Sequence, residues 1–84
     1  MMEKYDFVKV IDFYNDEGLS EEYMGVGRAL VGNNAMVIGF YSGGSRPSAY
    51  SDYDVEICFF DQELQELAME YGFDYWDITE LEVI

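Results

Sequence analysis

The last third of this chain is strongly and uniformly acidic. Residues 52–84 contain eleven acids and no Lys, Arg or His, whereas residues 23–51 contain no acid and two bases, Arg28 and Arg46. The first 22 residues carry seven acids against two lysines, so the net charge of −14 divides into −5, +2 and −11 along the chain. Self-repulsion of this kind destabilises a small fold. The pattern therefore indicates that the negative charge either serves the function of the protein or keeps the chain soluble.

The composition nevertheless predicts a folded protein. Half of the residues are hydrophobic, and the aromatic residues number eight Tyr, six Phe and one Trp, whereas disordered segments are poor in aromatic and β-branched residues. The length fits one domain, residues 1–84, whose core is small because short chains bury a smaller share of their surface. We therefore expect a folded body under an acidic surface.

The first half of the chain is predicted to contain two helices. Residues 20–31 fit a helix that begins at Ser20, a good N-cap, with acids in its first turn. Gly25 and Gly27 disfavour that helix, and a hairpin of strands 23–31 and 35–41 is the alternative. Residues 3–15 also have helical spacing, although a strand is the alternative there because the segment is rich in β-branched residues. The apolar positions of this first helix are Phe7, Val8, Ile11 and Tyr14.

The second half is predicted to form strands at 35–41, 50–60 and 73–78, with a loop at 42–49 and an acidic tail after 78. A helix over 61–71 begins at Asp61 and is stopped by Gly72. In the strand at 50–60 the side chains alternate: Tyr53, Val55, Ile57 and Phe59 face one way, and Asp52, Asp54, Glu56 and Cys58 face the other. The fold class is therefore α+β, a small antiparallel or mixed sheet of about three strands packed with two to three helices.

Several kinds of site are excluded by the residue inventory. The chain has no His and one Cys, Cys58, which excludes a zinc site, an internal disulfide and a Ser–His or Cys–His catalytic pair. We expect no cofactor and no catalytic residue. No leader sequence and no apolar run of about 20 residues is evident, so we expect a cytoplasmic protein.

The charge also limits the partners. Nucleic acid and anionic membranes repel a chain of this charge, so neither is expected as a direct partner, whereas basic protein surfaces attract it. A second copy of the same chain, in a homodimer, is the other partner that the sequence allows.

Two rows of carboxylates are candidates for such a contact. Asp52, Asp54 and Glu56 share one strand face, about 7 Å apart, and Glu63, Glu66 and Glu70 share one helix face, about one turn apart. The same pitch suits an ordinary solvated face, which is the alternative interpretation. Tyr and Trp supply rigid anchor contacts. The predicted partner-binding residues are Asp52, Asp54, Glu56, Glu63, Glu66, Glu70, Asp74, Trp76 and Asp77.

In size, charge and aromatic content the whole chain resembles the small acidic inhibitors that phages direct against restriction and CRISPR systems. Many members of these families act as DNA mimics. The resemblance implies an inhibitor without enzymatic activity that occupies the DNA or RNA channel of a basic nucleic-acid-binding protein in a bacterial host cell. It rests on composition rather than on a motif, so it identifies no functional residue.

A second resemblance covers about 20 residues. The runs Val37-Ile38-Gly39-Phe40-Tyr41-Ser42-Gly43-Gly44 and Ser51-Asp52-Tyr53-Asp54-Val55 resemble the minimal nucleotidyltransferases, whose strand-borne carboxylates hold Mg²⁺ and a nucleotide. The resemblance implies that Asp52 and Asp54 are metal ligands, with a third carboxylate from Asp74 or Asp77. Phe40 stands where that family has Ser, so an active or a degenerate nucleotidyltransferase-like domain is the alternative function.

Overall fold

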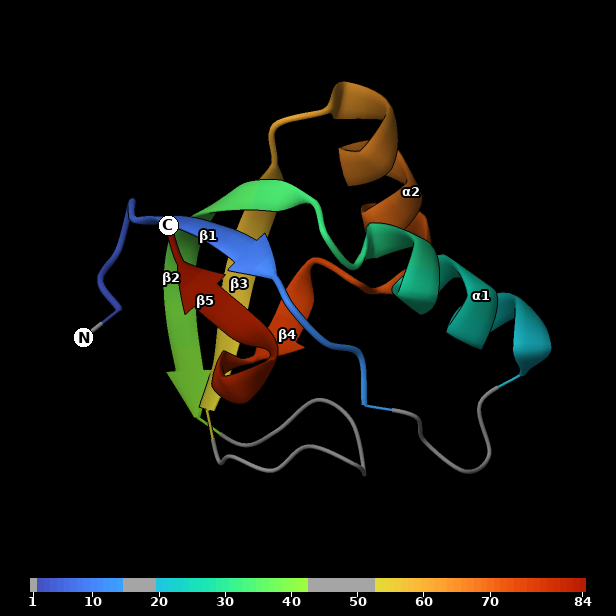
Figure 1. The fold of residues 1–84 in the computed structure, drawn as a ribbon, viewed down its shortest axis with the longest axis horizontal. Coiled ribbons are helices and arrows are strands. Elements are labelled where there is room, and N and C mark those ends of the chain that lie inside the picture. Colours follow the sequence, from blue (N-terminus) through green and yellow to red (C-terminus); the bar gives the residue numbers. More distant parts are fainter. Residues whose placement is uncertain (1, 15–19, 43–52) are drawn as a thin grey trace.

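Two helices and a five-stranded antiparallel sheet form the part of the chain that the computed structural model describes, residues 2–14, 20–42 and 53–84 (Figure 1). The strand order is β4-β3-β2-β1-β5. The α+β class agrees with the prediction, but the expected sheet of about three strands is wrong, because both ends of the chain add a strand. The elements are β1 (Phe7–Val10), α1 (Glu21–Leu30), β2 (Asn34–Ser42), β3 (Tyr53–Phe59), α2 (Gln62–Tyr71), β4 (Tyr75–Asp77), the 3-10 turn η1 (Ile78–Glu80) and β5 (Leu81–Val83).

Strand β1 lies where a helix was predicted for residues 3–15. Val8 and Val10 are fully buried, whereas Phe7 and Ile11 are about half exposed, at 54% and 45%. The true period is therefore two, and the helical spacing depended on Phe7 and Ile11, which do not face the core. β-branched valines fit a pleated strand, and β1 pairs with β2 on one side and with β5 on the other.

Strand β5 lies where an acidic tail was predicted after residue 78. Leu81 is opposite Val10 and Val83 is opposite Val8 in the antiparallel pair of β5 with β1. Leu81 is also buried. The tail prediction is wrong because the pairing partner lies some 70 residues away, where no local pattern reveals it.

The sheet has to curl, because η1 joins its two edge strands. Asp77 and Leu81 are separated by four peptide units, which span at most about 14 Å, whereas the edge strands of a flat sheet of five strands lie about 19 Å apart. Both helices lie on the same side of the sheet (Figure 1). The hydrophobic core fills the space between the helices and the sheet.

Both helices follow the local signals in the sequence. The Ser20 hydroxyl accepts a hydrogen bond from the Tyr23 backbone N–H at 3.3 Å, so the helix is confirmed over the alternative hairpin. The Asp61 carboxylate accepts one from the Glu63 N–H at 2.9 Å. Gly72 ends α2 with a φ of 78°, a left-handed conformation that favours glycine.

Strand β2 confirms the strand predicted at 35–41, and β3 lies within the strand predicted at 50–60. The predicted loop at 42–49 lies, after Ser42, outside the described residues. Of the residues predicted to share one face of β3, Val55, Ile57 and Phe59 are buried, whereas Tyr53 is 57% exposed.

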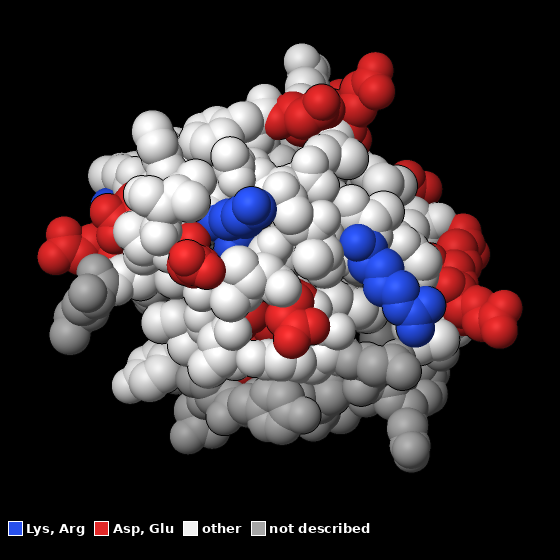
Figure 2. All heavy atoms as spheres, in the orientation of Figure 1, with Lys and Arg blue, Asp and Glu red and all other residues white. Residues whose placement is uncertain are grey.

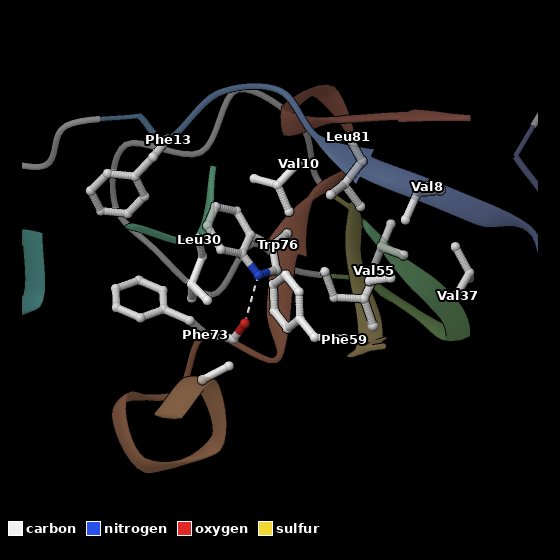
Figure 3. Packing of buried hydrophobic residues seen from close by; sticks show 13 residues of the cluster. Val8, Val10, Phe13, Leu30, Val37, Val55, Phe59, Phe73, Trp76 and Leu81 are labelled. Atoms are coloured by element: carbon white, nitrogen blue, oxygen red, sulfur yellow. Dashed lines mark hydrogen bonds between the residues drawn. The ribbon is translucent and has the colours of Figure 1, made fainter. Parts of the chain in front are cut away.

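Trp76 lies at the centre of the core (Figure 3). The side chain is fully buried, with ring centroids 6.0 Å from Phe13 and 5.8 Å from Phe73. Its indole N–H donates a hydrogen bond to the Phe73 carbonyl oxygen at 2.6 Å, which satisfies the one polar group that this large side chain takes into the core.

Candidate functional site: an acidic face on two helices

The outer side of α2 carries a row of acids. Glu63, Glu66 and Glu70 are exposed, as their spacing predicts. On the opposite side Ala68 is buried and Leu64 packs partly buried against the core. No Lys or Arg occurs on α2, so the row has no internal counter-charge.

Helix α1 adds a fourth acid to this row. The Tyr71 hydroxyl at the end of α2 donates a hydrogen bond to the Glu22 carboxylate in the first turn of α1, and the Tyr23 and Tyr71 rings meet edge to face, with centroids 5.1 Å apart. We name Glu22, Glu63, Glu66 and Glu70 the acidic helix face. Sequence reasoning did not include Glu22, because its position beside α2 depends on how the two helices pack.

The distribution of charge agrees with this grouping. Figure 2 shows acidic side chains over α2 and at the outer end of α1. The middle of the same view carries basic side chains together with further acidic ones, and other acids lie at its left edge. Arg28, in the last turn of α1, is exposed at the end of that helix opposite to Glu22.

The proximity of the acids changes the titration of Tyr71. The hydrogen bond to Glu22, followed by partial desolvation and the charges of Glu22 and Glu70, raises the pKa of Tyr71 to about 12. The hydroxyl therefore keeps its proton at neutral pH. It donates a hydrogen bond to the Glu22 carboxylate, while Glu70 acts on it only through its charge.

A polar hollow lies at the N-terminal end of the face. Asp61, Gln62, Glu63 and Glu66 line an open depression of about 530 Å³. With three carboxylates at its rim, the hollow is chemically suited to the ammonium or guanidinium group of a basic side chain.

Other predicted partner-binding residues lie away from this face or inside the protein. Trp76 and Asp77 are buried, at 0% and 1% exposed, and Asp54 is 7% exposed. Glu56 and Asp74 are half-buried. Asp52 lies outside the described residues.

Asp77 belongs to a capping structure around η1. Its carboxylate oxygen Oδ1 accepts hydrogen bonds from the backbone N–H and the hydroxyl of Thr79, at 2.9 and 2.6 Å. The buried Glu80 carboxylate accepts from the Asp77 N–H at 3.0 Å and from the Tyr14 N–H at 2.9 Å. These two acids therefore hold β4, β5 and the segment after β1 together.

Asp54 has a different environment. It lies opposite Asp77 on β4 and opposite Tyr41 on β2, and its buried Oδ1 atom has no hydrogen-bond partner. Of the two residues considered as a third carboxylate for a metal, Asp77 is therefore the one beside Asp54. Within the described ranges, however, no group of three or more His, Cys, Asp or Glu side chains is arranged to hold a metal ion.

Comparisons with family models, with curated proteins and with solved structures find no match to this chain. Within the described part of the chain, neither helix has the length and apolar character needed to cross a bilayer.

Proposed function

We propose that this protein is a non-enzymatic inhibitor that uses the acidic helix face to occupy the DNA- or RNA-binding channel of a basic protein. The observation that carries the proposal is the row of four exposed carboxylates across α1 and α2, with no base on α2 to match them. A surface that serves only solubility usually mixes both signs of charge.

The spacing of the row supports a resemblance to a phosphate backbone. Along the axis of α2, Glu63, Glu66 and Glu70 are separated by rises of about 4.5 and 6 Å. A single DNA strand carries one charge about every 3.4 Å. A channel lined by Lys and Arg for phosphates therefore meets carboxylates at a pitch of the same order.

The proposal changes which predicted residues take part. Trp76 and Asp77 are buried and hold the fold together, so the aromatic contact comes instead from Tyr23, which is 40% exposed beside the acids. Tyrosine is common at the energetic centres of protein interfaces.

The test is charge reversal with a matched control. The variant Glu63→Lys/Glu66→Lys/Glu70→Lys changes the net charge by six units on the acidic helix face. The control Glu3→Lys/Asp12→Lys/Glu82→Lys makes the same change at exposed positions elsewhere. Both variants, together with the wild-type protein, are used to capture partners from a bacterial lysate, with and without competing duplex DNA.

We expect the wild-type protein to retain a nucleic-acid-binding protein that duplex DNA displaces. The control variant should retain it more weakly, and the α2 variant should lose it. Raising the salt from about 0.15 M to 1 M shortens the screening length from about 8 Å to about 3 Å and should release the partner. Retention that is insensitive to salt and to DNA, or equal in the two variants, contradicts the proposal.

A second candidate, the nucleotidyltransferase-like domain, is favoured by one observation, the unpartnered Asp54 oxygen opposite Asp77. A bound Mg²⁺–nucleotide complex would stabilise the fold by mass action. The melting temperature with nucleoside triphosphate and Mg²⁺, compared with Mg²⁺ alone at equal ionic strength, tests it. We expect no difference for the inhibitor, whereas a shift that Asp54→Asn abolishes would favour the second candidate.

A further inference from the structure

Two tyrosines flank a carboxylate on one face of the sheet, away from the acidic helix face. Glu56 on β3 lies opposite Gly39 on β2 and opposite Tyr75 on β4. The Tyr41 hydroxyl, also from β2, donates a hydrogen bond to Glu56 Oε1 at 3.0 Å. The Tyr41 and Tyr75 rings have centroids 5.6 Å apart and planes inclined at 66°. We name Tyr41, Glu56 and Tyr75 the tyrosine patch.

Gly39 leaves space for this arrangement. A Cβ atom at position 39 would lie 3.1 Å from Tyr41 Cε2 and 3.2 Å from its hydroxyl oxygen, so the ring of Tyr41 lies across the glycine to reach Glu56. Tyr41 is nevertheless 49% exposed, and Glu56 and Tyr75 are half-buried. Ring surface therefore stays accessible beside the carboxylate.

The charges around the patch are negative. The hydrogen bond to Glu56 and the charge of Glu56 raise the pKa of Tyr41. The charge of Glu56, followed by partial burial and the charge of Asp74, raises the pKa of Tyr75. Residues 52–84 contain no base, so β3 and β4 offer these acids no positive neighbour of their own.

We propose that the tyrosine patch binds an arginine side chain of the partner protein. A guanidinium group is planar, stacks on aromatic faces and pairs with a carboxylate through two parallel N–H groups. Glu56 retains acceptor capacity for it, because an ionised carboxylate has about four lone-pair sites and the Tyr41 hydroxyl uses one. Lysine fits less well, since its ammonium group is compact, strongly hydrated and lacks a planar face.

This inference rests on the proposed function for the identity of the partner as a basic protein. The chemistry of the patch is testable without that partner. A nonapeptide of arginine and a nonapeptide of lysine carry the same charge, so the acidic helix face attracts both. The ratio of their dissociation constants therefore isolates the contribution of the guanidinium group.

We expect the wild-type protein to bind the arginine peptide about two- to fivefold more tightly than the lysine peptide, the ratio that a cation–π contact at an exposed ring provides. The variants Tyr41→Leu and Glu56→Gln should lower the ratio. Gly39→Ala, whose Cβ would lie 3.1 Å from the Tyr41 ring, should lower it. The matched control Glu66→Gln removes one charge from α2 and should weaken both peptides while keeping the ratio. In NMR spectra the arginine peptide should shift the ring protons of Tyr41 and Tyr75.

A ratio of about one in the wild-type protein, or a preference for the lysine peptide, overturns the inference. A ratio that persists in both Glu56→Gln and Tyr41→Leu does so as well. Should Tyr41→Leu fail to fold, Glu56→Gln and Gly39→Ala carry the test. The proposed function fails separately, when charge reversal on α2 leaves capture of the partner unchanged.

Discussion

The Tyr71 hydroxyl on α2 donates a hydrogen bond to the Glu22 carboxylate on α1, 49 residues earlier in the chain. This contact connects the two helices that carry the acidic helix face. It brings Glu22 into the row formed by Glu63, Glu66 and Glu70. It also couples the packing of the helices to the protonation of a phenol.

The contact predicts a loss of stability at alkaline pH. The pKa of Tyr71 is about 12 in the folded protein, above the value of about 10 for an unperturbed tyrosine. The contribution of the protonated Tyr71 hydroxyl to the free energy of unfolding is therefore complete below about pH 10. It is lost as the pH rises through about 12. We expect Tyr71→Phe to remove this part of the pH dependence. Urea unfolding at several pH values from about 8 to 12 measures it.

Tyr5→Phe is the control, because Tyr5 is 62% exposed and its backbone N–H donates a hydrogen bond to the Val37 carbonyl oxygen on β2 rather than to either helix. Tyr41 and Tyr75 also have raised pKa values, so Tyr71→Phe should keep a residual alkaline loss of the same sign. An unfolding free energy whose pH dependence is identical in the wild-type protein and in Tyr71→Phe contradicts the prediction.

Trp76 is predicted to matter for stability and not for partner binding. Trp76→Ala should cost about 3–5 kcal/mol, because it leaves a cavity between Phe13 and Phe73. Since small domains are stable by only about 5–15 kcal/mol, Trp76→Phe is the more useful variant. We expect a lower midpoint of urea unfolding and normal capture of the partner. A folded Trp76→Phe protein that no longer captures the partner would show that Trp76 takes part in binding.

The two glycines of α1 are predicted to respond in opposite directions to alanine. A Cβ at Gly27 would lie 2.6 Å from two ring atoms of Phe13, whereas a Cβ at Gly25 meets nothing within 4 Å. Gly27→Ala should destabilise the protein by about 1–3 kcal/mol through overpacking. Gly25→Ala should stabilise it by about 0.5–1 kcal/mol, because alanine is the better helix former. Thermal or urea unfolding of the two variants measures both changes in the unfolding free energy. Equal changes of the same sign would contradict the prediction.

Glu80 and Glu82 form a second matched pair. The buried Glu80 accepts hydrogen bonds from the backbone N–H groups of Asp77 and Tyr14, whereas Glu82 is exposed. Glu80→Ala leaves buried donors without an acceptor and should cost about 1–3 kcal/mol. Glu82→Ala removes the same charge and should have little effect on the unfolding free energy. Similar unfolding curves for the two variants would contradict the structural role of Glu80.

The helices could be predicted because their signals are local. Ser20, Asp61 and Gly72 act on backbone groups within a few residues of themselves, and the exposed row Glu63, Glu66 and Glu70 follows from helical spacing alone. The first and last strands could not be predicted in the same way. β5 is a short segment that pairs with β1 from the other end of the chain, and β1 is a short segment that pairs with both β5 and β2.

The residues of the candidate site also differ in whether the local sequence or the tertiary packing decides their role. Trp76 and Asp77 were predicted to bind the partner, but both are buried and cannot contact it. Their neighbours in the sequence do not indicate this burial, because the surrounding residues come from distant segments. Glu22 shows the converse. It is an ordinary acid after an N-cap in sequence, and it joins the acidic helix face only through Tyr71.

The sequence by itself determined the charge of −14, the capped helix α2 and the acidic row on it, since composition, capping and helical periodicity involve residues close together in the chain. For α1 it favoured a helix with a hairpin as the alternative. Only the tertiary structure decided that the sheet has five strands, that Asp54, Asp77 and Glu80 are buried, and that Tyr41, Glu56 and Tyr75 meet on one face. These features depend on strand register and on the packing of distant segments, whose free energy comes from contacts that no local pattern contains.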